Sequence, residues 1–339
     1  MKIVIDARLL DKINNTGISR YIEFLLEYYS GKYPMQDIYI ISNDRRFHYN
    51  ECNVIYTGLK PYNILHFFLF YFKIAKLKLT LYHAPFYSGL AFRSKTKVVV
   101  TVHDLMYRIV PNFFSKNLIV NKLKIAYFDC IVRLSLQSAD EIVSVSQTTS
   151  NDVFNFLKRN SFTIPENSEI NVTSDDRILK KFNLTKKNFF LYCGNSRPHK
   201  NLNILYKVFE TKKDLPLLVM AGKGHRAGIN LLNVGTVSDH ELKSLYESAI
   251  AFVFPSFYEG FGLPVLESFY SRTIVVASKI PAFLEFKSDN IIFFDPDNIE
   301  ELYIALKDAQ GRKFIDNDFM DKFNNKNLIA KYDELLAKV

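Results

Sequence analysis

Short apolar runs rich in β-branched residues recur along the whole chain, with stretches of helical periodicity between them. This alternation is typical of βα units, in which helices join parallel strands. We predict strands at residues 2–6, 37–41, 53–57, 79–84, 97–104 and 141–146 of the first half, and at 188–194, 216–222, 230–235, 251–256, 273–278 and 290–295 of the second. The sequence therefore predicts an α/β fold with two doubly wound parallel sheets.

A polar stretch without clear periodicity, residues 160–176, separates the two series of strands, and we interpret it as an interdomain linker. The 339 residues suffice for about two domains, since a single core stops growing near ~250 residues. We expect Rossmann-like domains at 1–165 and 166–315, followed by a C-terminal helix at 316–339 that packs back towards the first domain. Because ligands bind beyond the carboxyl ends of parallel strands, the cleft between the two sheets is the predicted active site.

The positive charge of the chain is concentrated in its first half. Residues 1–165 contain 21 Lys and Arg against 12 Asp and Glu, whereas residues 166–339 contain 23 of each. Such a basic half favours an anionic partner: a phosphorylated ligand, an acidic membrane or nucleic acid. Ordinary solvated lysine explains the excess equally well. No motif of interleaved aromatic and basic residues supports nucleic acid, so we expect none as a partner.

Cysteine usage and the first residues favour a cytoplasmic protein. The three cysteines form no paired pattern that would suggest disulfides or a zinc site. The opening MKIVIDARLL contains Asp6 and Arg8 where a signal peptide requires an apolar run, so it is interpreted as a strand. Contact with the inner face of the cytoplasmic membrane remains compatible with this location.

The most apolar window is YNILHFFLFYFKIAKLKL at residues 62–79. Lys73, Lys76 and Lys78 leave it short of the ~20 residues that a membrane-spanning helix requires. A core helix is the favoured interpretation, because a helix that is apolar almost all round is normally buried. An interfacial helix that contacts an anionic membrane together with the basic first domain remains the alternative.

The segment YEGFGLPVLE at residues 258–267 follows a predicted central strand. Its glycines allow backbone conformations that are closed to other residues, and Pro264 suits the first turn of a helix. The amides and the dipole of such a helix start favour a phosphate group. Glu259 lies on the loop and Glu267 in the first helical turn, where carboxylates accept hydrogen bonds well from sugar diols. Helix capping accounts partly for Glu267 but not for Glu259.

This segment, extended to FVFPSFYEGFGLPVLES, resembles the signature of the family 4 retaining glycosyltransferases of the GT-B fold, in which two glutamates enclose seven residues. Other segments resemble the family in the expected order: DARLLDKINNTGISRY (6–21), TVHDL (101–105), VSVSQTTSNDV (143–153), YCGNSRPHKNLNILYKVF (192–209), PLLVMAGKG (216–224) and GTVSDHELKSLYESAIAFVFPS (235–256). The resemblance covers nearly the whole chain.

The resemblance implies roles for residues at matching positions. Lys200, with Arg197 nearby, matches a clamp for the donor diphosphate, whose departure calls for a cation. Glu259 matches the glutamate beside the transferred sugar, and Glu267 the glutamate that binds the ribose. His103 matches a histidine placed against the donor sugar. The remaining implied contacts are Gly262, Leu263, Pro264, Val265 and Gly17 for the donor nucleotide and phosphates, Gly260, Phe261 and Asp104 for the donor sugar, and Thr16 and Arg20 for the acceptor.

The resemblance thus implies a retaining, metal-independent glycosyltransferase. Its donor would be a nucleotide diphosphate hexose, with mannose as the predicted sugar. Its acceptor would be a glycan or lipid-linked saccharide in surface polysaccharide or lipopolysaccharide synthesis. The alternative is a non-catalytic protein of the same fold that binds nucleotide sugars or glycans.

Two further motifs carry less weight. FFDPDN at residues 293–298 contains an Asp-x-Asp pattern known from metal sites, but Pro296 indicates a turn, so we predict neither metal nor other cofactor. AGKGHRAG at residues 221–228 lacks the spacing of a dinucleotide-binding loop.

Overall fold

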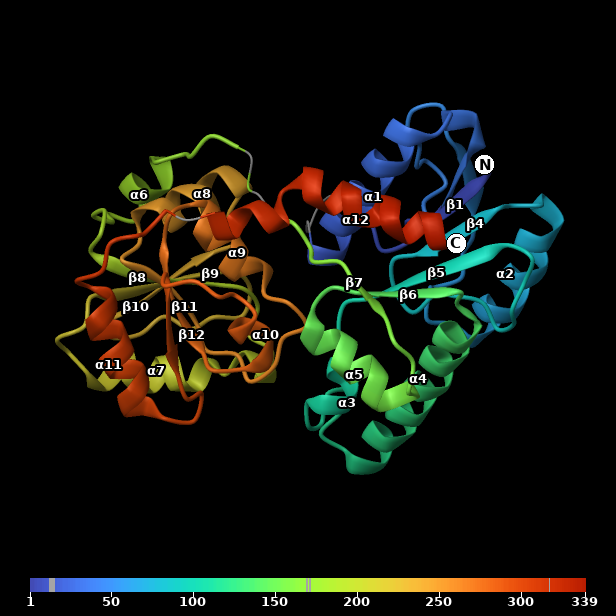
Figure 1. Cartoon of the computed structure of the whole chain (residues 1–339). Helices are drawn as coiled ribbons and strands as arrows, with labels where there is room; N and C mark the ends of the chain where they lie inside the picture. Colours follow the sequence, from blue (N-terminus) through green and yellow to red (C-terminus); the bar gives the residue numbers. More distant parts are fainter. Residues whose placement is uncertain (12–15, 169, 171, 317) are drawn as a thin grey trace. The chain divides into compact units, whose positions relative to one another are not determined.

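The computed structural model describes residues 1–11, 16–168, 170, 172–316 and 318–339. The chain divides into two compact units (Figure 1). Unit 1 comprises Met1–Glu166 together with Asn325–Val339, and unit 2 comprises Asn167–Asn324. The division falls at Glu166, inside the stretch that the sequence indicates as a linker.

Unit 1 is built on a seven-stranded parallel sheet with the order β3-β2-β1-β4-β5-β6-β7. Its strands are β1 (Ile3–Asp6), β2 (Ile38–Ser42), β3 (Asn53–Tyr56), β4 (Leu81–Ala84), β5 (Lys97–Val102), β6 (Glu141–Ser144) and β7 (Phe162–Thr163). The six predicted strands are confirmed. The interpretation of residues 160–176 as linker throughout is wrong, because β7 pairs with β6 at the edge of the sheet; residues 169 and 171 of that stretch lie outside the described residues.

Helices cover both faces of this sheet, because its strands are apolar on both sides. Side chains at alternating positions of β1 enter different cores: Ile3 and Ile5 pack with α1 (Gly17–Lys32) and α12 (Asn325–Lys338), and Val4 packs with the helices of the opposite face. Those helices are α2 (Ile64–Leu77), α4 (Leu118–Ser138) and α5 (Gln147–Leu157), and the short helices η1 (Met35–Asp37) and α3 (Met106–Ile109) complete the unit.

Helix α2 occupies most of the apolar window at 62–79. It buries His66, Phe67, Phe70 and Ile74 in the core and leaves Leu65, Phe68, Leu69 and Phe72 exposed. The interpretation as a core helix therefore holds for one face of the helix only.

Unit 2 contains a six-stranded parallel sheet with the order β10-β9-β8-β11-β12-β13. Its strands are β8 (Phe189–Cys193), β9 (Leu217–Ala221), β10 (Leu231–Gly235), β11 (Ala251–Phe254), β12 (Ile274–Ser278) and β13 (Ile291–Phe294), and all six predicted strands are confirmed. Its helices are α6 (Arg177–Lys181), η2 (Pro198–Lys200), α7 (Leu202–Thr211), α8 (Asp239–Ser248), α9 (Leu263–Tyr270), α10 (Pro281–Leu284), α11 (Ile299–Ala309) and η3 (Asp318–Phe323). Figure 1 shows α7 beside α11, and α8 close to α6 and α9.

The predicted C-terminal helix at 316–339 is two separate elements in the described residues, η3 in unit 2 and α12 in unit 1. Asn324 lies between them, and residue 317 lies outside the described residues.

In each sheet the strand order reverses once, between β1 and β4 in unit 1 and between β8 and β11 in unit 2. The connections that leave the two strands at such a switch point run to opposite faces of the sheet and leave a crevice at the carboxyl ends. Polar residues at these two places are therefore the first candidates for a ligand site.

Candidate active site

Lys200 and Glu259 meet at the switch point of unit 2. The segment that follows β8 ends in η2 with Lys200, and the loop that follows β11 contains Glu259. Lys200 Nζ donates a hydrogen bond to Glu259 Oε1 at 2.7 Å, and the two side chains are only 13% and 12% exposed. Ser256 Oγ donates to the same oxygen at 2.7 Å. The fold thus brings two predicted site residues, 59 positions apart in the chain, into direct contact.

The surroundings of Lys200 include an aromatic ring and a neutral histidine. Its ammonium lies 4.7 Å from the centroid of the Phe254 ring, a favourable cation–π distance. Burial and the neighbouring Lys200 cation lower the pKa of His199 to about 4, so His199 is neutral at pH 7. Arg197, the other predicted cation, is exposed at the N-cap of η2. The pair can therefore offer a positive charge to an anionic ligand and a carboxylate to hydroxyl groups.

The backbone before α9 turns sharply at Gly262. Its φ of +122° is a conformation that favours glycine, and a Cβ there would lie 2.9 Å from Cε1 of Phe283. Pro264 lies in the first turn, as predicted. Proline has no amide hydrogen, and the Val265 amide donates to Gly262 O at 2.9 Å. A phosphate contact through a backbone amide thus suits Gly262 and Leu263 better than Pro264 and Val265, and the donor contacts of all four residues stay predictions.

The neighbours of this turn are apolar. Phe261 is buried and packs against Phe286 and Phe323, with ring centroids 5.3 and 5.9 Å away. Gly260 precedes it on the loop. The sugar contacts implied for Gly260 and Phe261 stay predictions, and any contact from Phe261 would come from its backbone because its ring is enclosed.

Glu267 is buried in α9, in the second turn rather than the predicted first turn, because the helix begins only at Leu263. Ser168 Oγ donates to its Oε1 at 2.7 Å, and Tyr246 OH donates to its Oε2 at 3.0 Å. Ser168 comes from the stretch interpreted as a linker and Tyr246 from α8. These two hydroxyls fix the orientation of the carboxylate, and neither was predicted.

His103 lies buried just beyond β5. Its Nδ1 is 2.8 Å from Glu166 Oε1 and its Nε2 is 2.8 Å from the carbonyl oxygen of Pro85. Both partners are acceptors, so this arrangement suits an imidazolium that donates from both nitrogens. Burial lowers the pKa of His103, but the Glu166 carboxylate more than offsets it, and the pKa lies above its ordinary value. The structure places His103 at the expected sheet edge, and Glu166 is a partner that was not predicted.

The remaining predicted residues of unit 1 lie at helix starts. Thr16 is the N-cap of α1 and its Oγ1 accepts from the Ser19 amide at 3.3 Å, while Gly17 is the first residue of α1. Arg20 lies in the first turn of the same helix. Asp104 Oδ1 accepts from the Met106 amide at 2.8 Å at the start of α3. Capping accounts for the position of Thr16, and the turn before α3 accounts for that of Asp104. The ligand roles of all four residues stay predictions, and residues 12–15 lie outside the described residues.

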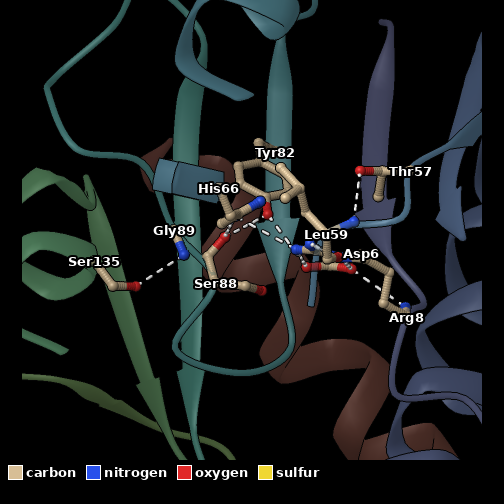
Figure 2. A network of polar contacts seen from close by, with 9 residues as sticks. All are labelled: Asp6, Arg8, Thr57, Leu59, His66, Tyr82, Ser88, Gly89 and Ser135. Carbon is tan, nitrogen blue, oxygen red and sulfur yellow. Dashed lines mark hydrogen bonds and ion pairs between the residues drawn. The ribbon is translucent and has the colours of Figure 1, made fainter. Parts of the chain in front are cut away.

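A polar cluster fills the switch point of unit 1 (Figure 2). Arg8 forms a buried ion pair with Asp6, through Nε–Oδ1 at 2.8 Å and Nη2–Oδ2 at 2.5 Å, and the Arg8 cation offsets burial to keep the pKa of Asp6 below its ordinary value. Arg8 Nη1 donates to Leu59 O at 2.9 Å. Tyr82 OH donates to Ser88 O, which lies 2.9 Å from Nε2 of His66.

The cluster ties together the segments that leave three strands. Arg8 follows β1, Leu59 follows β3 and Ser88 follows β4. Burial, followed by the charge of Arg8, lowers the pKa of His66 to about 4, so that at pH 7 the cluster contains one cation and one anion. The chain that runs from β1 towards Thr16 and Gly17 is therefore anchored at Arg8.

Solved structures share this architecture over the whole chain. Sucrose-phosphate synthase from Thermosynechococcus elongatus superposes with a TM-score of 0.76 at 17% sequence identity, covering 100% of this chain and 98% of that chain. HepE from Anabaena in complex with UDP gives a TM-score of 0.70 at 14% identity, covering 100% of both chains. At such identities the likeness establishes the fold alone, and the predicted GT-B class, with two doubly wound parallel sheets, is confirmed.

Sequence relatives narrow the class to a family. Residues 174–310, which include Lys200, Glu259 and Glu267, match the family model of glycosyl transferases group 1. The O-antigen chain mannosyltransferase RfbU of Salmonella typhimurium is 30% identical over 249 residues, which cover 69% of this chain and 65% of the relative. The match thus spans just under two thirds of that relative. Residues 174–310 are thus similar to the glycosyl transferases group 1, in agreement with the resemblance seen in the sequence.

Proposed function

We propose that the chain is a retaining glycosyltransferase that transfers mannose from a nucleotide diphosphate donor to a hydroxyl group of a growing surface glycan at the cytoplasmic side of the membrane. The observation that carries the proposal is the Lys200–Glu259 pair at the switch point of unit 2, beside the start of α9. The O-antigen chain mannosyltransferase RfbU supports the sugar and the glycan class, and the UDP complex of HepE supports a nucleotide diphosphate.

The pair suits a reaction in which a diphosphate departs. Lys200, together with Arg197, would move towards the phosphates and balance the charge that develops on the leaving oxygen. The amides of Gly262 and Leu263 add partial positive charge at the helix start. When Lys200 moves away, the Glu259 carboxylate becomes able to accept hydrogen bonds from the sugar hydroxyls.

The proposed transfer keeps the configuration of the sugar. The bond from the anomeric carbon to the diphosphate oxygen breaks while the acceptor hydroxyl attacks from the same face. The acceptor proton passes to a phosphate oxygen of the leaving group, and Glu259 orients the sugar without forming a covalent bond to it. Since Lys200 and Arg197 supply the positive charge, no metal is required, and treatment with EDTA should leave turnover unchanged.

The substitution Glu259→Gln tests the role of the pair. It keeps the shape of the side chain but removes the negative charge, so we expect turnover to fall at least about 100-fold, while the affinity for the free nucleotide diphosphate stays nearly the same. Donor preference is first established by thermal shift with GDP-, UDP- and dTDP-sugars, and turnover is then followed by nucleotide release and product analysis.

The control is Glu247→Gln, which removes an exposed carboxylate of α8 and should leave turnover unchanged. A loss of nucleotide affinity in the Glu259 variant would reassign that residue to nucleotide binding. Donor binding without any turnover by the unsubstituted protein would instead favour the non-catalytic alternative. An inverted product would contradict the retaining mechanism.

A further inference from the structure

Helix α2 exposes a row of large apolar side chains. Leu65, Leu69 and Phe72 are 55%, 54% and 60% exposed. Their spacing of four and three residues places them on one face of the helix, opposite the side that packs in the core. Removing this apolar area from water would be favourable, so this face suits a partner that offers an apolar surface or a lipid interior.

The first turns of α4 carry a second row. Ile119, Leu123 and Tyr127 follow one another at intervals of four residues and are 72%, 67% and 40% exposed. The two rows meet where α2 begins, because Tyr127 OH donates to Tyr62 O at 2.8 Å and accepts from the Ile64 amide at 3.0 Å. We call the six residues Leu65, Leu69, Phe72, Ile119, Leu123 and Tyr127 the α2–α4 surface.

The charged side chains of α2 and of residues 118–127 of α4 are all positive. Lys73 and Lys76 on α2 and Lys122 and Lys124 on α4 are exposed. Residues 52–103 and 105–128 contain no Asp or Glu, so no carboxylate of these segments neutralises the lysines. In unit 2, by contrast, large exposed apolar residues such as Ile229, in the loop before β10, and Ile304, on α11, lie singly.

We propose that the α2–α4 surface binds an anionic lipid bilayer, with its apolar side chains in the headgroup region and its lysines on lipid phosphates. Leucine and aromatic side chains flanked by lysines are the composition of helices that lie in the plane of a membrane. Lysines near an anionic leaflet strengthen binding about five-fold each. With 14 residues, α2 is suited to lie in that plane, since a spanning helix requires ~20 residues.

Binding to vesicles tests the proposal with the full chain. Vesicles of phosphatidylcholine with one-third phosphatidylglycerol should cosediment with the protein at low salt, and vesicles of phosphatidylcholine alone should bind it far more weakly. High salt should release the protein, because it screens the lysines. The variants Leu69→Glu and Leu123→Glu should each weaken binding about ten-fold or more, without changing the thermal unfolding midpoint, since both side chains are largely exposed.

Matched variants separate this surface from general effects of charge. Ile304→Glu introduces the same charge at a side chain of unit 2 that is 64% exposed, and binding should stay unchanged. Lys122→Glu with Lys124→Glu should weaken binding roughly 25-fold or more. Lys207→Glu with Lys213→Glu, two exposed lysines of unit 2, should have little effect.

The proposal is overturned if anionic vesicles fail to bind at low salt, or if Ile304→Glu weakens binding as much as Leu123→Glu. A second outcome would also overturn it: the protein does not bind vesicles, forms a dimer, and becomes a monomer in the Leu123→Glu variant. The α2–α4 surface would then be a subunit interface. Turnover with a soluble acceptor should be the same in all these variants. Failure of membrane binding is therefore distinguishable from failure of the proposed transferase function.

Discussion

Two glutamates on one short segment have different environments and so different chemical uses. Glu259 faces a lysine that a phosphate can attract away, so its carboxylate can exchange partners when a ligand arrives. Glu267 is buried and held by the hydroxyls of Ser168 and Tyr246, so its direction is fixed. Residue type alone does not distinguish them, whereas the partners do.

Substitution of Glu166 tests what raises the pKa of His103. Because the folded-state pKa of His103 lies above the unfolded value of 6.5, its stabilising contribution is complete below pH 6.5 and is lost as pH rises through the folded-state pKa. Glu166→Gln should lower that pKa by about 1 unit or more, measured by NMR titration of the labelled imidazole. The window in which stability falls should move to lower pH.

Glu141→Gln, at the start of β6, is the matched control and should leave the titration of His103 unchanged. If Glu166→Gln and Glu141→Gln give the same titration curve, Glu166 is not the group that holds the proton on His103. If Glu166→Gln changes turnover but leaves the titration of His103 unchanged, Glu166 affects the reaction by a route other than the pKa of His103.

At the scale of an element, the start of α9 depends on Gly262. Gly262→Ala should cost about 3 kcal/mol of the free energy of unfolding, because the substitution adds both backbone strain and a clash with Phe283. Gly235→Ala provides the control: φ is +74°, but the added Cβ meets nothing within 4 Å. Strain alone should then cost about 1 kcal/mol. Urea denaturation measures the free energy of unfolding of both variants. Equal losses would show that the structure around Phe283 relaxes to remove the clash.

The sequence was sufficient to predict the sheets, because strands buried on both faces are continuous apolar runs. It did not predict β7, which has only two residues at a sheet edge and so shows no periodicity. For α2 the sequence showed which residues are apolar but not which face the core covers, since nearly every position is apolar.

The sequence predicted the site residues that belong to local motifs but not their partners from distant parts of the chain. Lys200 and Glu259 belong to motifs at strand ends, and parallel topology brings strand ends together. Ser168 and Glu166 contact residues 99 and 63 positions away, and no local pattern encodes such pairs. A signal that was available is the segment Phe162–Ile164 shortly before Glu166, in which Thr163 stands between two apolar residues, a composition typical of strands.

At the scale of the whole molecule, the core of unit 1 is built from two separate segments, Met1–Glu166 and Asn325–Val339. Leu328, Tyr332 and Leu335 of α12 are buried in its core beside α1. Leu335→Ala should therefore cost about 2 to 5 kcal/mol of the stability of unit 1. Hydrogen exchange should show lower protection in β1 and α1 and unchanged protection in β8 and β11.

Leu336→Ala, on the partly buried side of the same helix, should have a smaller effect. An equal loss of protection in both units after Leu335→Ala would mean that they unfold as one cooperative body.

The return of α12 to unit 1 also sets an order of events on the ribosome. Residues 325–339 are synthesised after all of Asn167–Asn324, yet they belong to the unit that begins at Met1. At about 5 to 20 residues per second, the roughly 160 residues of unit 2 take about 10 to 30 s to make. Of the two units, the one begun first is thus completed last, and during that interval the core between α1 and the first sheet lacks the three buried side chains that α12 contributes.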